Sequence, residues 1–144
     1  MDLPNNNSKT SARLERQSPA PEAGLSLTVY IVDVDDDTHK SGAISGQVVD
    51  LSMQGMHIQI TAVENKGLHI IKDHTTAFKN HLLVEIDLPV GKVTIEGFAV
   101  WYRQSEDLKY WNVGVYIKEM SSQDLALYEG YLTSVDKPVS AGTP

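Results

Sequence analysis

Two groups of residues in this sequence are of types that bind metal ions: an acidic run and five histidines. The run Asp33-Val34-Asp35-Asp36-Asp37 has the alternating carboxylates of a calcium-binding loop. Such a loop has glycine at its sixth position and a bidentate glutamate at its twelfth, where this chain has Thr38 and Ile44. The five histidines include no pair with H-x-x-x-H spacing, and the chain has no cysteine. We therefore expect no metal site, and we interpret the acidic run as a solvated turn.

Catalytic patterns are not found either. The sequence has no G-x-S-x-G nucleophile turn, no glycine-rich phosphate loop and no dinucleotide fingerprint. Glu85, Asp87 and Glu96 could supply an acid–base pair, but carboxylates on the solvated face of a strand are the ordinary case. We expect no catalytic residues, no cofactor and no enzyme activity.

The segment Asp50-Leu51-Ser52-Met53-Gln54-Gly55 has the chemistry of a ligand-binding turn. Asp50 and Ser52 carry short polar side chains that can bond either to the local backbone or to a ligand. Gly55 allows a positive φ or a close backbone approach. The same pattern fits an ordinary β-turn, so the residues alone leave both interpretations open.

Four aromatic residues surround the turn at 104–109, namely Trp101, Tyr102, Tyr110 and Trp111. They could stack on nucleotide bases or simply cover the protein near a hairpin. Because few cations lie nearby in the sequence, we favour the second interpretation.

The elements that must position these residues have a period of two, which is typical of half-buried strands. Alternating apolar residues predict six strands, a proline–glycine turn at 88–91 and a bulge at Gly97. Ser121 and Asp124 then predict the start of a helix, in which Leu125, Tyr128, Leu132 and Val135 follow helical spacing. We expect an all-β fold, a six-stranded antiparallel barrel with one C-terminal α-helix. The strands are predicted at 25–31, 43–51, 56–61, 82–88, 92–103 and 111–117.

Both ends of the chain differ in composition from this central region. Residues 1–24 contain three prolines and few large apolar side chains, so we expect a flexible N-terminal arm. Residues 25–135 form the predicted barrel domain, and residues 136–144 are predicted to be a disordered tail.

The charge balance limits the possible partners. Twelve Lys and Arg residues stand against 19 Asp and Glu residues, a formal net charge of -7. This argues against broad binding to nucleic acid or to an anionic membrane surface, although two or three arginines suffice for a compact anionic ligand. No apolar run reaches the roughly 20 residues of a membrane span, and the polar start is unlike a signal peptide. We expect no membrane insertion and a cytoplasmic location.

The turn segment also resembles a family signature. D/N-x-S-x-x-G followed by an alternating strand is the hallmark of PilZ domains, and Asp50, Ser52 and Gly55 match its three fixed positions. The segments 85–91, 97–101 and 112–117 resemble later strands of the family, in the same order. The resemblance covers roughly residues 12 to 133, and it implies the barrel and helix that the apolar pattern predicts.

PilZ domains typically bind the bacterial second messenger cyclic di-GMP through this turn and an R-x-x-x-R motif before the first strand. Guanidinium groups suit both the phosphates and the O6/N7 edge of the guanines of such a ligand. Here Arg16 matches the second arginine position, Ala12 stands at the first, and Arg13 is one residue further on. The resemblance implies a ligand site made of Arg13, Arg16, Asp50, Ser52 and Gly55.

Two functions follow from this resemblance. The first is a cyclic di-GMP receptor, in which ligand binding moves the N-terminal arm and changes the surface that a partner protein meets. The second is a PilZ-like module that binds only proteins and no nucleotide. The arginine arm is the feature that separates them.

Overall fold

The computed structural model describes residues 24–71 and 80–141, the last six of these as backbone only. Arg13 and Arg16, with almost all of the predicted arm, lie outside the described residues, as do residues 142–144 of the predicted tail.

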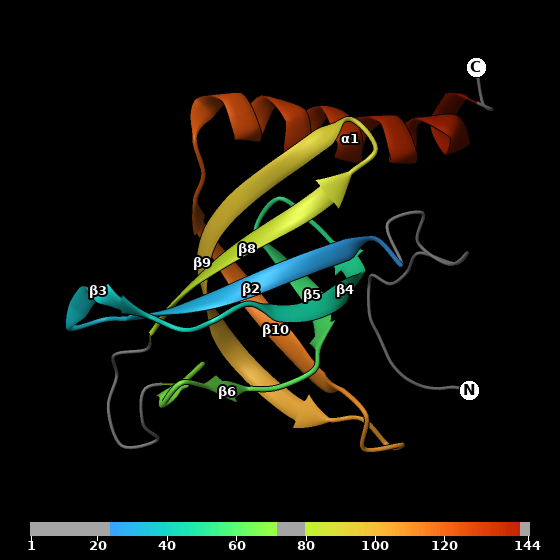
Figure 1. Ribbon diagram of the computed structural model, residues 1–144. Coiled ribbons are helices and arrows are strands. Elements are labelled where there is room, and N and C mark those ends of the chain that lie inside the picture. Colours follow the sequence, from blue (N-terminus) through green and yellow to red (C-terminus); the bar gives the residue numbers. More distant parts are fainter. Residues whose placement is uncertain (1–23, 72–79, 142–144) are drawn as a thin grey trace.

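Six antiparallel strands close into a barrel (Figure 1). Their order around the barrel is β2-β4-β5-β10-β9-β8, and β8 pairs with β2 to complete the ring, with Val29 opposite Val84. Closure leaves none of the six strands with a fully unpaired edge. The predicted fold class is therefore confirmed. The strands are β2 (Ser26–Asp33), β4 (Ile44–Leu51), β5 (Gly55–Ile60), β8 (His81–Leu88), β9 (Gly91–Gln104) and β10 (Trp111–Glu119).

The barrel interior is filled by the apolar residue at every second strand position. On β8, for example, Leu82, Val84 and Ile86 are completely buried, and the residues between them face outward. Each such side chain contributes about 1.5–3 kcal/mol when it leaves water. The apolar residues whose alternation predicts the strands are thus the same residues that form the core.

Strand β9 changes phase, as predicted, but at a different residue. Gly97 keeps regular pairing with Leu82 on β8, and the extra residue on β9 is Val100, which lies between Ala99 and Trp101 in the register with β10. Gly97 is needed for another reason, since a Cβ there would lie 2.2 Å from the backbone oxygen of Tyr116. The bulge turns both Val100 and Trp101 outward.

Three short strands were missed by the apolar pattern because their residues are mostly polar. The acidic run continues into β3 (Asp36–Lys40), an exposed strand that pairs with β2. Carboxylates of Asp33 and Asp36 accept nearby backbone N–H groups, which explains why the acidic residues suit this turn. The other two, β6 (Glu64–Asn65) and β7 (Leu68–His69), form a small hairpin.

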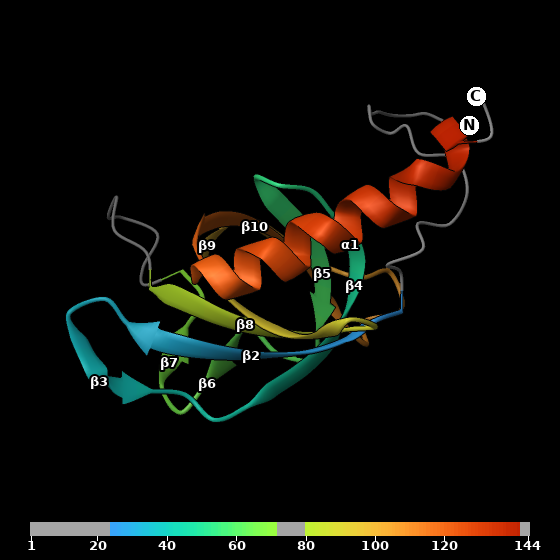
Figure 2. The ribbon, with the colours of Figure 1, turned by 90° about the horizontal axis from the view of Figure 1, so that it is seen from above.

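Helix α1 (Ser122–Ala141) lies across one end of the barrel (Figure 2). The predicted start is correct: the Ser121 hydroxyl accepts the N–H of Asp124 at 3.0 Å. Tyr128, Tyr131 and Leu132 are buried, whereas Leu125, predicted on the apolar face, is exposed. The helix also extends past Val135, because an apolar pattern marks the last packed residue and not the last helical one.

Candidate functional site

The turn that joins β4 to β5 is built by its own serine. The Ser52 hydroxyl accepts the N–H of Gly55 at 3.1 Å and donates to the carbonyl of Gly55 at 3.0 Å. The backbone N–H of Ser52 donates to the same carbonyl at 2.9 Å. Ser52 therefore stabilises the turn by bonding to the local backbone, which is one of the two roles that the sequence left open.

Gly55 is required by close approach and not by a positive φ. A Cβ at this position would lie 2.7 Å from the backbone oxygen of Val115 on β10. The neighbouring Gln54 carbonyl accepts the N–H of Ile117 at 2.9 Å, which holds the turn against β10. The glycine lets the turn sit directly on the barrel wall.

Asp50 is directed to the outer wall by a bulge. Val48 lies opposite Ile58, and Asp50 lies opposite His57, so Val49 is an extra residue on β4. The Asp50 carboxylate accepts the N–H of Leu51 at 3.1 Å. Its half-buried side chain is thereby placed beside His57 at the end of the strand.

His57 belongs to a row of polar side chains that crosses three strands of the outer wall. Its Nε2 lies 2.9 Å from Oδ1 of Asn112, and the same oxygen accepts a hydrogen bond from Gln59 at 3.1 Å. Gln47 in turn donates to Gln59 at 3.0 Å. These bonds hold the His57 ring in one position, and the sequence pattern did not single out this row.

Burial lowers the pKa of His57, against the smaller opposing effects of its bond to Asn112 and of the nearby Asp50 carboxylate. Arg103 acts in the same direction as burial, since its positive charge disfavours a second cation nearby.

Trp101 provides a flat apolar surface beside this row. Its ring centroid lies 5.2 Å from that of His57 in an edge-on arrangement, and the Arg103 guanidinium lies 5.7 Å from the indole ring. The ring lies across Gly114, where a Cβ would come within 2.0 Å of its Nε1. Trp101 remains 40% exposed, so a planar ligand could reach it.

The predicted aromatic cluster is divided between two sides of the wall. Tyr102 packs against Trp111 with ring centroids 5.8 Å apart and against His69 with centroids 5.4 Å apart. Tyr102 and Trp111 are partly buried and pack against the core. These two cover the barrel near the hairpin, as favoured from the sequence. Trp101, directed outward by the bulge, is the member available for stacking.

We call the outward-facing set Asp50, His57, Trp101, Arg103 and Asn112 the outer wall site. Of the predicted site residues, the structure brings together Asp50, Ser52 and Gly55 in one turn, and Asp50 alone of these belongs to the outer wall site. The cross-strand register that unites it with Trp101 is not visible in a single sequence. A cluster of histidine and carboxylate side chains able to hold a metal ion is not found among the described residues. Within the same residues, no helix is both long and apolar enough to cross a membrane.

Among the comparisons with known proteins, only the search of solved structures found a similarity. No protein-family model matches the sequence, and no curated protein does. Among solved structures, the fold is similar to the "PilZ domain with c-di-GMP of YcgR from Escherichia coli", with 9% identity and a TM-score of 0.48. The similarity covers 82% of this chain and 89% of that chain. The closed six-stranded barrel, the helix across its end and the Asp50–Gly55 turn are the features predicted from the PilZ resemblance. The chain therefore has the fold that the PilZ resemblance implies.

Proposed function

We propose that this chain is a PilZ-type cyclic di-GMP receptor that signals to a partner protein through its N-terminal arm. The observation that carries the proposal is the outer wall site, in which the Asp50 carboxylate and the exposed Trp101 ring lie on either side of His57. The YcgR domain named above is described as a complex with c-di-GMP. We expect the module to act in the cytoplasm, as a binding protein and not as an enzyme.

The outer wall site offers the groups that a guanine nucleotide needs. A carboxylate accepts hydrogen bonds from ring N–H and amino groups, and an indole ring stacks on a base. Arg103 is the one arginine of the chain outside the predicted arm, and its planar guanidinium suits a phosphate or the O6/N7 edge of guanine. Ser52 and Gly55 support the site by holding the turn in place.

Arg13 and Arg16 are proposed to complete the site from the arm. The N–H of Gly24 donates to the carbonyl of Val48 at 3.0 Å, two residues before Asp50. Arg16 is eight residues before Gly24, and eight residues can span up to about 27 Å. The arm therefore starts beside the strand that carries Asp50, within reach of a nucleotide held there.

The test compares ligand affinity with stability in substituted proteins. We expect Arg16→Ala and Asp50→Ala each to weaken cyclic di-GMP binding by about 1.5–3 kcal/mol, the cost of a lost charge-assisted hydrogen bond. Lys9→Ala, on the same arm, is the control and leaves affinity unchanged. Melting curves should show little change for either variant without ligand. If both variants bind as tightly as the unmodified chain, the ligand does not contact Arg16 or Asp50 and the proposed site is wrong. If the unmodified chain binds no cyclic di-GMP, the interaction-module alternative replaces the receptor.

A further inference from the structure

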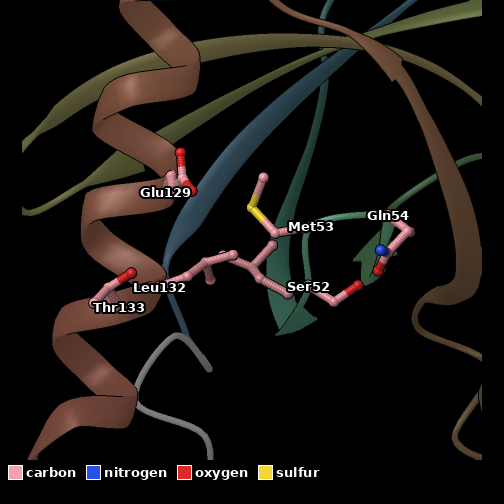
Figure 3. A pocket seen from close by; sticks show the side chains of 7 residues that line it. Ser52, Met53, Gln54, Glu129, Leu132 and Thr133 are labelled. Carbon is pink, nitrogen blue, oxygen red and sulfur yellow. The ribbon is translucent and has the colours of Figure 1, made fainter.

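A groove lies between the β4–β5 turn and helix α1. Its volume is about 390 Å³, and its walls are the turn residues 51–54 and one stripe of the helix. Figure 3 shows Leu132 pointing from the helix toward the turn, with Met53 opposite. The stripe contains Glu129, Leu132 and Thr133, which share one helix face because they are three and four residues apart.

The chemistry of the groove favours one aliphatic side chain next to a cation. Leu51 and Leu132 form an apolar floor, and the thioether of Met53, 39% exposed, adapts to differently shaped groups. Glu129 is the charged residue of the lining, and it is a carboxylate. A cavity of about 150 Å³ holds a benzene molecule, so this groove has room for an aliphatic side chain and adjoining backbone.

The described chain begins at Gly24, close to this groove. β2 and β4 are antiparallel, with Ser26 opposite Gln47 and Val29 opposite Ile44, so the chain before Ser26 runs along β4 toward the turn. Gly24 has reached Val48, which is three residues, about 10 Å of strand, from Leu51. A segment of chain that precedes Gly24 therefore needs to extend only a short distance to reach the groove.

The arm contains one segment of matching chemistry. Leu14 is its only large aliphatic residue besides Leu3 near the far end, and Arg13 and Arg16 stand on either side of it. Leu14 is ten residues before Gly24, and ten residues can span up to about 35 Å. This span exceeds the roughly 10 Å of strand between Val48 and Leu51. We propose that the segment Arg13–Arg16 docks in this groove when no nucleotide is bound, with Leu14 between Met53 and Leu132 and an arginine beside Glu129.

Weak intrinsic affinity is enough for such docking. A short linker gives an effective concentration in the millimolar range, so a segment with a Kd of about 1 mM is docked roughly half of the time. The regulatory consequence rests on the proposed function: arginines held in the groove are not at the outer wall site. Nucleotide then competes with the groove for the same segment.

The experiment measures proximity without nucleotide, so that its outcome is independent of cyclic di-GMP binding. The chain has no cysteine, and Gly130→Cys introduces a single spin-label site on an exposed helix position where a side chain meets open space. We expect the label to reduce the amide NMR signals of residues 12–17 by at least about half. The same label on Asp37→Cys, on the exposed strand β3, leaves those signals unchanged.

Two further samples make the result decisive. Leu14→Ser in the Gly130→Cys chain restores the signals, whereas Leu3→Ser does not. The proposal is overturned if residues 12–17 keep full intensity, or if Leu14→Ser leaves the loss unchanged. It is also overturned if an isotope-labelled chain loses these signals when mixed with a separate spin-labelled chain, because a second copy then fills the groove.

Discussion

The hydroxyl of Tyr128 donates a hydrogen bond of 2.7 Å to the backbone carbonyl of Ser52. Tyr128 is completely buried in the face of α1 that covers the barrel, and Ser52 lies in the turn that bears the D-x-S-x-x-G motif. The turn is also bonded to β10 through Gln54 and Ile117. Hydrogen bonds therefore join the β4–β5 turn both to helix α1 and to strand β10.

Removing this hydroxyl should lower stability. We expect Tyr128→Phe to reduce the free energy of unfolding by about 1–3 kcal/mol, because the Ser52 carbonyl loses its partner next to the core. Urea unfolding measures the change. Tyr116→Phe is the matched control, since this ring is 48% exposed, and it should change stability by less than about 0.5 kcal/mol. Equal effects of the two substitutions would contradict the role assigned to the bond.

Two glycines allow a direct test of the close approach at the turn. Gly55→Ala places a methyl group 2.7 Å from a backbone oxygen, so we expect a loss of about 1–3 kcal/mol from overpacking. Gly130→Ala meets no atom within 4 Å and should stabilise the helix by about 0.5–1 kcal/mol. Thermal unfolding of both proteins checks the opposite signs. A neutral Gly55→Ala would mean that the turn moves away from β10 freely.

The lowered pKa of His57 predicts a pH dependence of stability. In the unfolded chain its pKa is 6.5, and in the folded protein it is lower, so the unfolded state binds more protons between the two values. The free energy of unfolding should therefore fall as pH decreases below 6.5, and the His57 contribution should level off below the folded pKa. Urea unfolding from about pH 7.5 to about pH 5 measures this slope. His57→Gln should have a shallower slope, and an unchanged slope would show that other groups cause it.

Trp101 should contribute to nucleotide affinity through stacking. We expect Trp101→Ala to weaken cyclic di-GMP binding by about 1–3 kcal/mol, the usual value for one stacked base. Val100→Ala is the control, because Val100 is the adjacent bulge residue and is also half exposed. Fluorescence or calorimetric titration compares the two. If they bind with the same affinity, the ligand does not stack on this ring.

Most of the fold could be predicted because barrel strands bury one face. The alternation on β8, with Leu82, Val84 and Ile86 inward, is a direct record of that burial. β3 could not be found this way, since all five of its residues are exposed and no apolar side chain marks its register. On α1, Leu125 follows the same helical spacing as Tyr128 but is 37% exposed, whereas Tyr131, which the pattern did not include, is buried.

The candidate site was only partly predictable for a related reason. Asp50, Ser52 and Gly55 are adjacent in sequence, and a local turn determines how they interact. The link from Asp50 to Trp101 depends on bulges at Val49 and Val100 and on pairing across four strands. Such pairing is a property of the closed barrel, and no short segment of sequence contains it.

Isothermal calorimetry of the unmodified chain with cyclic di-GMP tests the central proposal most directly. We expect a saturable heat whose magnitude changes with temperature, because stacking on Trp101 buries apolar surface and gives a negative heat-capacity change. The titration is repeated at several temperatures so that one temperature of zero enthalpy cannot hide binding. No heat at any temperature, at high ligand concentration, would contradict the receptor function and favour the alternative, a PilZ-like fold that binds only proteins.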